Sequence, residues 1–226
     1  MCKYYLVVAG NEETVAYSAV GRDGIWHNFS RIYFMGTLFP LIPVFPPGFT
    51  YFPDFISANE EQTLIEAIQQ VELSPMQFQG YTALRKVRSF GYDYHFDTRS
   101  MSKGSPIPPA FHGLAEKLAL QLSVSVTSLA EMLLTEYPPG SVINWHRDAP
   151  PFDVIAGISL LGDVSFKLRP HDKLKQSRKA TLSIPVQRRS LYVIQGEART
   201  DWQHSTAPVS TTRYSITFRT LRGDAI

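Results

Sequence analysis

The chain has 226 residues, of which 44% are hydrophobic and 19% are charged, and its formal net charge is +2. These values are ordinary for a globular protein, so they exclude a disordered polyelectrolyte, and the small charge does not demand a nucleic-acid partner. The single cysteine, Cys2, excludes a disulfide framework and a thiolate metal site, so any bound metal must be held by nitrogen and oxygen ligands.

The N-terminal region predicts neither a membrane span nor a secretion signal. Prolines interrupt its most apolar stretch, residues 32–55, and no run of about 18 apolar residues occurs, as a spanning helix would require. A basic start and a small-residue cleavage site are also missing, which favours a cytoplasmic protein. Because residues 1–45 show no sustained period and end in prolines, we expect an extension over residues 1–45 and one domain over residues 46–226.

The first regular patterns along the chain are helical and extended. The segment SANE at residues 57–60 is typical of a helix start, and the helix is expected to continue to about residue 71 with Leu64, Ile65 and Ile68 on one face. Tyrosine, phenylalanine and valine over residues 82–94 predict strands. Leucines at helical spacing then predict a second helix over residues 110–122.

The remainder of the chain has the pattern of β-structure. Short alternating segments separated by turn residues predict strands over residues 128–137, 154–161, 164–169, 180–184, 190–195 and 213–220. Two helices followed by many short strands indicate an α+β fold with a double-sheet core, such as a jelly roll.

The sharpest local feature is the motif NWHRD at residues 144–148. In an extended segment alternate residues point to the same face, so His146 and Asp148 project together. They could occupy two corners of an octahedral metal ion, and a second histidine would complete a facial triad of two histidines and one carboxylate. His204, in a turn expected at DWQH (residues 201–204), is the best candidate. The alternative explanation of the pair is a salt bridge on the surface.

The segment RYSITFR at residues 213–219 alternates like a strand. One face of this strand would carry Arg213, Ser215, Thr217 and Arg219. Guanidinium groups are costly to bury alone but bind carboxylates in a bidentate fork, so this face suits a dicarboxylate ligand. An exposed edge strand with two solvated arginines is the alternative. The HxD motif, the downstream histidine and this strand together favour the ligand-binding interpretation.

The order HRD, WQH and RYSITFR resembles the AlkB family of Fe(II)- and 2-oxoglutarate-dependent dioxygenases, over residues 49–219. Other segments that match the family pattern are LTEYPPG at residues 134–140, GYDY at 91–94, FH at 111–112 and GEAR at 196–199. The resemblance implies a double-stranded β-helix (jelly-roll) core with N-terminal helices and a nucleotide-recognition lid. It also implies that His146, Asp148 and His204 bind Fe(II).

The resemblance further implies a set of cofactor-binding residues. Arg213 and Tyr137 would bind the distal carboxylate of 2-oxoglutarate, and Arg219 would lie near its chelated end and near the metal aspartate. Thr135 and Ser215 replace two asparagines of the family pattern, and both can still form hydrogen bonds. The implied reaction uses O2, converts 2-oxoglutarate to succinate and CO2, and hydroxylates a C–H bond, often of an N-methyl group that leaves as formaldehyde.

The sequence departs from the family where a base would be recognised. Pro150 stands where DNA-repairing members have an acidic residue, and Arg85 lies near the place of a stacking tryptophan. Cations and aromatic residues are nevertheless combined on the expected lid, where they could bind phosphates and stack on unpaired bases. The candidate substrate contacts are Arg85, Arg88, Tyr92 and Tyr94.

We therefore expect a monomeric AlkB-like dioxygenase that demethylates alkylated bases of single-stranded DNA or RNA, as in DNA repair. One alternative is the same oxygenase chemistry on a protein or small-molecule substrate, which Pro150 and the absent tryptophan favour. A second alternative is a non-catalytic β-sandwich binding module in which the HxD motif has no role.

Overall fold

The computed structural model describes residues 45–223 except residues 79 and 96–97. These residues belong to one compact unit. The extension predicted over residues 1–45 lies outside the described residues except for its last position, so this domain boundary stays a prediction. Among the residues that the structure describes, no helix is long and apolar enough to cross a lipid bilayer.

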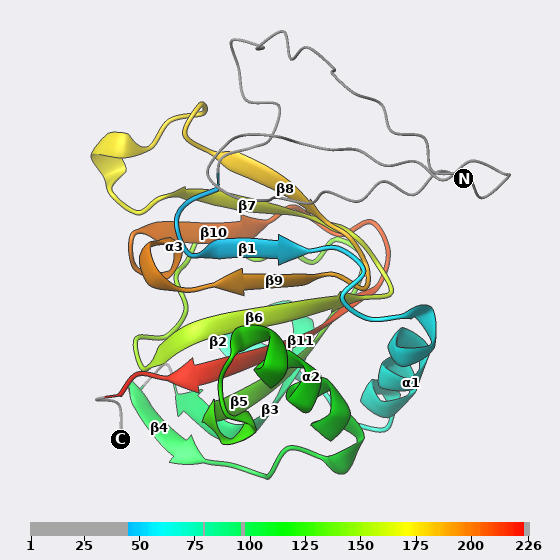
Figure 1. Ribbon diagram of the computed structural model, residues 1–226. Coiled ribbons are helices and arrows are strands. Elements are labelled where there is room, and N and C mark those ends of the chain that lie inside the picture. The colour runs from blue at the N-terminus through cyan, green and yellow to red at the C-terminus, as the bar shows by residue number, and fades with distance from the viewer. Residues whose placement is uncertain (1–44, 79, 96–97, 224–226) are drawn as a thin grey trace, which may run out of the picture. The chain divides into compact units, whose positions relative to one another are not determined.

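The larger of two antiparallel sheets has the strand order β1-β9-β6-β11-β5-β3-β2, and β4 pairs with β3 (Figure 1). Its strands are β1 (Phe49–Phe52), β2 (Ser74–Phe78), β3 (Tyr81–His95), β4 (Ser100–Lys103), β5 (Leu129–Tyr137), β6 (Phe152–Leu160), β9 (Leu191–Ile194) and β11 (Arg213–Leu221). Strand β11 therefore lies between β6 and β5, near the centre of the sheet, which buries most of its residues.

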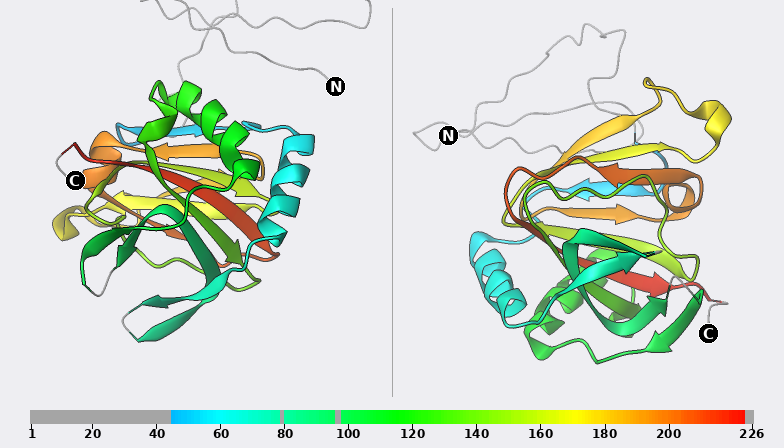
Figure 2. Two further views of the ribbon diagram at one scale, coloured as in Figure 1. Left: turned by 90° about the horizontal axis from the view of Figure 1, so that it is seen from below. Right: turned by 180° about the vertical axis from the view of Figure 1, so that it is seen from behind.

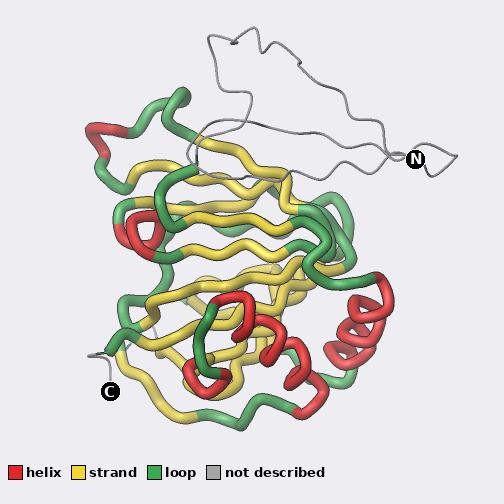
Figure 3. The backbone as a smooth tube through the Cα atoms, in the orientation of Figure 1, coloured by secondary structure: helices red, strands yellow, loops and turns green. Residues whose placement is uncertain are grey.

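The smaller sheet has the order β10-β7-β8, with β7 at Val164–Pro170, β8 at Leu182–Val186 and β10 at Trp202–Thr206 (Figure 3). Apolar side chains from both sheets form one core cluster, which includes Phe152 and Ile194 of the larger sheet and Phe166 and Leu168 of the smaller one. The two sheets thus face each other across this core, which is the predicted jelly roll.

Two helices cover the outer face of the larger sheet. They are α1 (Ala58–Gln69) and α2 (His112–Leu122), and their apolar faces join Met132, Ile158 and Phe218 in a second core cluster. The start of α1 is a capping box, in which the backbone N–H of Glu60 donates to the Ser57 hydroxyl and the Glu60 carboxylate accepts from the Ser57 N–H. Figure 2 shows β2 and β4 on the side of the sheet away from α2.

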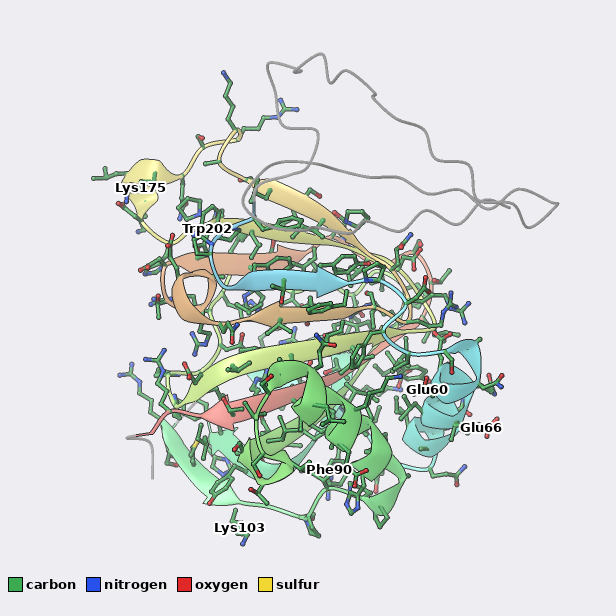
Figure 4. The ribbon with its side chains drawn as sticks, in the orientation of Figure 1. Glu60, Glu66, Phe90, Lys103, Lys175 and Trp202 are labelled. Carbon is green, nitrogen blue, oxygen red and sulfur yellow. The ribbon has the colours of Figure 1, made fainter. Side chains whose placement is uncertain are left out.

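A buried carboxylate fixes α1 to the strands. Glu61 accepts a hydrogen bond of 2.7 Å from Arg188 Nη2 and one of 2.8 Å from the backbone N–H of Leu161. Glu66, one turn further along the helix, is exposed and points away from the sheet (Figure 4). The start of the helix is therefore held by an ion pair with the connection that follows β8 and by a hydrogen bond from the connection that follows β6.

The predicted helices are present, as are the strand structure predicted over residues 82–94, which is β3, and the six later predicted strands, with shifts of a few residues at their ends. The helix predicted over residues 110–122 begins as the short 3-10 turn Pro109–Phe111 before it continues as α2. Strands β1, β2, β4 and β10 were not predicted. They are short and lie at or near the sheet edges, where pairing with a neighbouring strand defines a strand more than its own alternation does.

Candidate functional site

Three candidate metal ligands converge between the two sheets. One ligand atom each from His146, Asp148 and His204 lies within 4.8 Å of the others. His146 and His204 exchange two backbone hydrogen bonds, of 3.0 and 2.9 Å, and their ring centroids are 4.2 Å apart. Residues 144–148 form a loop with this single bridge and not a strand, and the chain bends at Trp145. His146 and Asp148 nevertheless present their ligand atoms to the same place, as predicted.

The prediction that His204 lies in a turn is wrong. His204 is the third residue of β10 and pairs with Leu168 of β7, while the preceding GEAR segment forms a short helix, α3 (Gly196–Thr200). The local sequence of β10 is polar and has little alternation, so its pairing with β7 determines its conformation. This pairing turns His204 into the space between the sheets.

Both imidazoles are suited to bind a metal in their neutral form. His146 Nδ1 lies 2.8 Å from the carbonyl oxygen of Asn144. A carbonyl oxygen can only accept, so Nδ1 carries the proton and Nε2 keeps a free lone pair. Burial, followed by the nearby His146, lowers the pKa of His204 to about 3, so the His204 ring is neutral at physiological pH.

Asp148 supplies a carboxylate oxygen that has no hydrogen-bond partner among the described residues. Its Oδ1 accepts hydrogen bonds of 3.1 and 2.8 Å from Nε and Nη2 of Arg219, whereas its buried Oδ2 has no hydrogen-bond partner and lies 3.5 Å from His204 Nε2. Burial by itself would raise the pKa of Asp148, but Arg219 holds it well below the usual range. A buried unpaired anion is costly, and a cation between this oxygen and two imidazoles would satisfy it. The donor set therefore fits Fe(II).

Arg199 holds the loop that carries Asp148. Its buried Nη2 donates to the carbonyl oxygens of Asp148, Ala149 and Phe152, at 3.1, 2.7 and 3.1 Å. Because Arg199 belongs to α3, which directly precedes β10, it joins the two halves of the metal cluster. No role was predicted for this arginine, although its place in the GEAR segment, which matches the family pattern, indicated a function near the metal histidine.

Glu131 is a second residue that the sequence analysis missed. It lies directly opposite Arg219 in the pairing of β5 with β11, and its Oε2 accepts from Arg219 Nη1 at 2.5 Å. Its Oε1 accepts from the Ser89 hydroxyl of β3 at 2.7 Å. A buried chain of contacts thus runs from Ser89 through Glu131 and Arg219 to the metal aspartate.

We expect Glu131→Gln to raise the dissociation constant for Fe(II) by about 10- to 100-fold, as is usual when a partner behind a metal ligand is lost. Without this anion, the charge of Arg219 acts on Asp148 alone and weakens it as a donor. Anaerobic metal titration of the full chain measures the effect. Glu136→Gln is the matched control, because Glu136 is on the same strand but pairs with Lys86. Equal Fe(II) affinity in the two variants would contradict the expectation.

Four of the five candidate 2-oxoglutarate residues form two pairs of β11 and β5 that are separated by one further pair, Arg213 with Tyr137 and Ser215 with Thr135. Arg213 is 2% exposed, its Nε donates to the Ser159 hydroxyl at 2.9 Å, and its guanidinium lies 4.9 Å from the Tyr137 ring centroid. These contacts orient the guanidinium. Ser215 does not line the cavity, and its hydroxyl lies 3.5 Å from the Tyr137 hydroxyl. The structure therefore places Ser215 behind Tyr137, as a support.

A cavity of about 1400 Å³ joins these groups to the expected substrate contacts. It is lined by the three candidate metal ligands, by four candidate 2-oxoglutarate residues (Thr135, Tyr137, Arg213 and Arg219) and by Arg85, Arg88, Tyr92 and Tyr94 of β3. Pro150 also lines it. Fe(II) bound here with 2-oxoglutarate and O2 supplies oxidative decarboxylation and hydroxylation of a C–H bond. The chain's own residues bind and orient the reactants and exclude water.

Comparison with known proteins agrees with this site. The model of the 2OG-Fe(II) oxygenase superfamily matches residues 48–219. Mouse tRNA (carboxymethyluridine(34)-5-O)-methyltransferase ALKBH8 is 29% identical over 170 residues, which are 72% of this chain and 24% of that protein. The Arabidopsis thaliana alkylated DNA repair protein ALKBH8 homolog is 24% identical over 179 residues (70% and 50%). Probable RNA/DNA demethylase ALKBH6 of Danio rerio is 27% identical over 171 residues (67% and 66%). This chain thus spans about a quarter of the mouse relative.

Solved structures agree in fold. OsALKBH1 matches with a TM-score of 0.63 at 14% identity, covering 79% of this chain and 99% of that chain. A Pseudomonas putida prolyl-4-hydroxylase matches with a TM-score of 0.56 at 14% identity, covering 77% and 93%. The chain belongs to the 2OG-Fe(II) oxygenase superfamily, whose enzymes use Fe(II), 2-oxoglutarate and O2, and its relatives among the ALKBH proteins support an AlkB-like member.

Proposed function

We propose that this dioxygenase oxidatively demethylates bases of single-stranded DNA or RNA, as a cytoplasmic monomer. One observation carries the proposal: the cavity that contains the metal cluster is also lined by two arginines and two tyrosines of β3. Arginines at such a place can bind phosphates, and aromatic rings can stack on an unpaired or extruded base. The names of the relatives, which include a tRNA enzyme, a DNA repair protein and a probable RNA/DNA demethylase, support the same substrate class.

A second candidate is the same chemistry on a protein or small molecule. Pro150 favours it, because this residue lines the cavity two positions after Asp148 and brings no charge that could recognise an alkylated base. The binding-module alternative loses its support, since the chain belongs to a family of enzymes and places all three candidate ligands together.

The test uses the full chain loaded with Fe(II), with 2-oxoglutarate and O2. The substrates are single-stranded DNA and RNA oligonucleotides that each carry one N-methylated base, their duplexes, unmethylated strands and a methylated peptide. We expect formaldehyde in step with succinate from methylated single strands, and loss of the methyl group by mass spectrometry. Consumption of 2-oxoglutarate without formaldehyde from any oligonucleotide would overturn the proposal, and formaldehyde from the peptide alone would establish the second candidate.

A lid variant makes this test sharper. Arg88 is exposed and lines the cavity, so Arg88→Gln should not disturb folding. If its guanidinium binds a phosphate, this variant raises KM for the oligonucleotide and lowers the slope of the salt dependence by about 1. Lys117→Gln, on α2, removes the same charge from the opposite face and is the matched control. Substrate-independent 2-oxoglutarate turnover should be unchanged in both variants.

A further inference from the structure

Tyr192 of β9 reaches across a glycine toward the centre of the larger sheet. It pairs with Gly157 of β6, and Gly157 in turn pairs with Thr217 of β11. A Cβ atom added at Gly157 would lie 2.3 Å from Cζ and 2.4 Å from the hydroxyl oxygen of Tyr192. The far end of the tyrosine therefore lies directly over β6, next to the inner row of β11 that carries Arg213 and Arg219. Only a glycine leaves room for it there.

The ring of Tyr192 is held in place from the side of the smaller sheet. Phe166 of β7 packs against it with ring centroids 4.9 Å apart, and Phe166 also stacks on His204 at 5.4 Å. Tyr192 is one of the residues that line the cavity. Its hydroxyl is thus directed into the space between the sheets, and Phe166 separates its ring from His204.

The contacts of Arg213 indicate which part of the cavity the hydroxyl faces. Arg213 Nε donates to the Ser159 hydroxyl at 2.9 Å, and Ser159 is two positions from Gly157 on the same face of β6. The guanidinium and the end of Tyr192 therefore lie over neighbouring positions of one strand. Burial, and next the nearby Tyr137, raises the pKa of Tyr192 to about 12, while Arg213 acts in the opposite direction. The phenol stays protonated at neutral pH and can donate a hydrogen bond to an anion.

We propose that the Tyr192 hydroxyl is a further ligand of the distal carboxylate of 2-oxoglutarate, beside Arg213 and Tyr137, and that Gly157 admits it. In this arrangement the distal carboxylate receives a donor from β9 as well as those from β5 and β11. The preference of the enzyme for 2-oxo diacids over 2-oxo monoacids then depends on the hydrogen bond from Tyr192 as well as on Arg213. The inference concerns the co-substrate and does not depend on which substrate is demethylated.

The direct test is Tyr192→Phe, which keeps the ring and removes only the donor. In an anaerobic titration of the Fe(II)-loaded full chain, followed by the visible charge-transfer band, we expect the Kd for 2-oxoglutarate to rise about tenfold, as loss of a hydrogen bond to a charged group predicts. The affinity for Fe(II) and for 2-oxopentanoate, which lacks the distal carboxylate, should not change. Tyr51→Phe is the matched control, because the Tyr51 hydroxyl accepts from the Gln187 backbone N–H and does not line the cavity.

Gly157→Ala tests the second half of the proposal. The added methyl group must displace the end of Tyr192, so this variant should weaken 2-oxoglutarate binding about as much as Tyr192→Phe, and the double variant little more than either. An unchanged Kd for 2-oxoglutarate in Tyr192→Phe would overturn the proposal. So would an equal loss of affinity for Fe(II) or 2-oxopentanoate, because that result would indicate a purely structural role. If Gly157→Ala does not fold, Tyr192→Phe alone decides.

Discussion

His146→Ala is expected to abolish the charge-transfer band of the Fe(II)–2-oxoglutarate complex and to lower turnover by more than about 100-fold, since even partners behind a metal ligand cost about 10- to 100-fold. The variant removes one of three donors from a cluster whose ligand atoms lie within 4.8 Å of one another. Anaerobic titration with Fe(II) and then 2-oxoglutarate measures the band, and succinate formation measures turnover.

The His146 variant is more informative than one at Asp148. Among the described residues, its imidazole hydrogen-bonds to one partner, a carbonyl of its own loop, and the backbone bridge to His204 does not need the side chain. Removing Asp148 would instead take from the buried Arg219 one of its two carboxylate partners, leaving only Glu131 of the pair, and would destabilise the fold. His112→Ala is the control, because His112 does not belong to the candidate metal cluster and its Nε2 lies 3.0 Å from the carbonyl oxygen of Ile107, in the segment before α2. An undiminished band in folded His146→Ala would contradict the assignment of the metal site.

Arg213→Met is expected to raise the Kd for 2-oxoglutarate by about 100-fold, since losing one partner of a buried charged pair costs about 2–5 kcal/mol. Methionine keeps much of the buried volume of the arginine stem but lacks the fork that binds a carboxylate. Arg213→Lys keeps the charge, and its Kd for 2-oxoglutarate should lie between those of Arg213→Met and the wild type, because an ammonium group cannot bind a carboxylate in a bidentate manner.

Titration with 2-oxoglutarate and, separately, with Fe(II) distinguishes a co-substrate effect from a general loss of structure. Fe(II) affinity should stay close to that of the wild type, because Arg219 and not Arg213 contacts the metal aspartate. Arg169→Met controls for removal of an arginine from the domain, since Arg169 stacks on Trp145 and does not line the cavity. If Arg213→Met bound 2-oxoglutarate as tightly as this control, the dicarboxylate site would have to lie elsewhere.

The sequence by itself determined those residues whose neighbours follow from spacing along the chain. In an extended backbone His146 and Asp148 share a face, as do Arg213 and Arg219, and these relations survive whatever the rest of the fold does. The same holds for the start of α1, where the capping residues are three positions apart. The chemistry of imidazole, carboxylate and guanidinium then narrowed the ligands to a metal and a dicarboxylate.

Only the tertiary structure decided the residues that act through another strand. Glu131 and Arg219 are 88 positions apart, and no local pattern shows that the pairing of β5 with β11 sets them opposite each other. Tyr192 looks like an ordinary strand residue until β6 supplies Gly157 beneath it. His204 becomes part of a strand because β7 pairs with it. Strand pairing is a long-range choice that the hydrophobic pattern of one segment does not encode, so these contacts become visible only in the folded sheet.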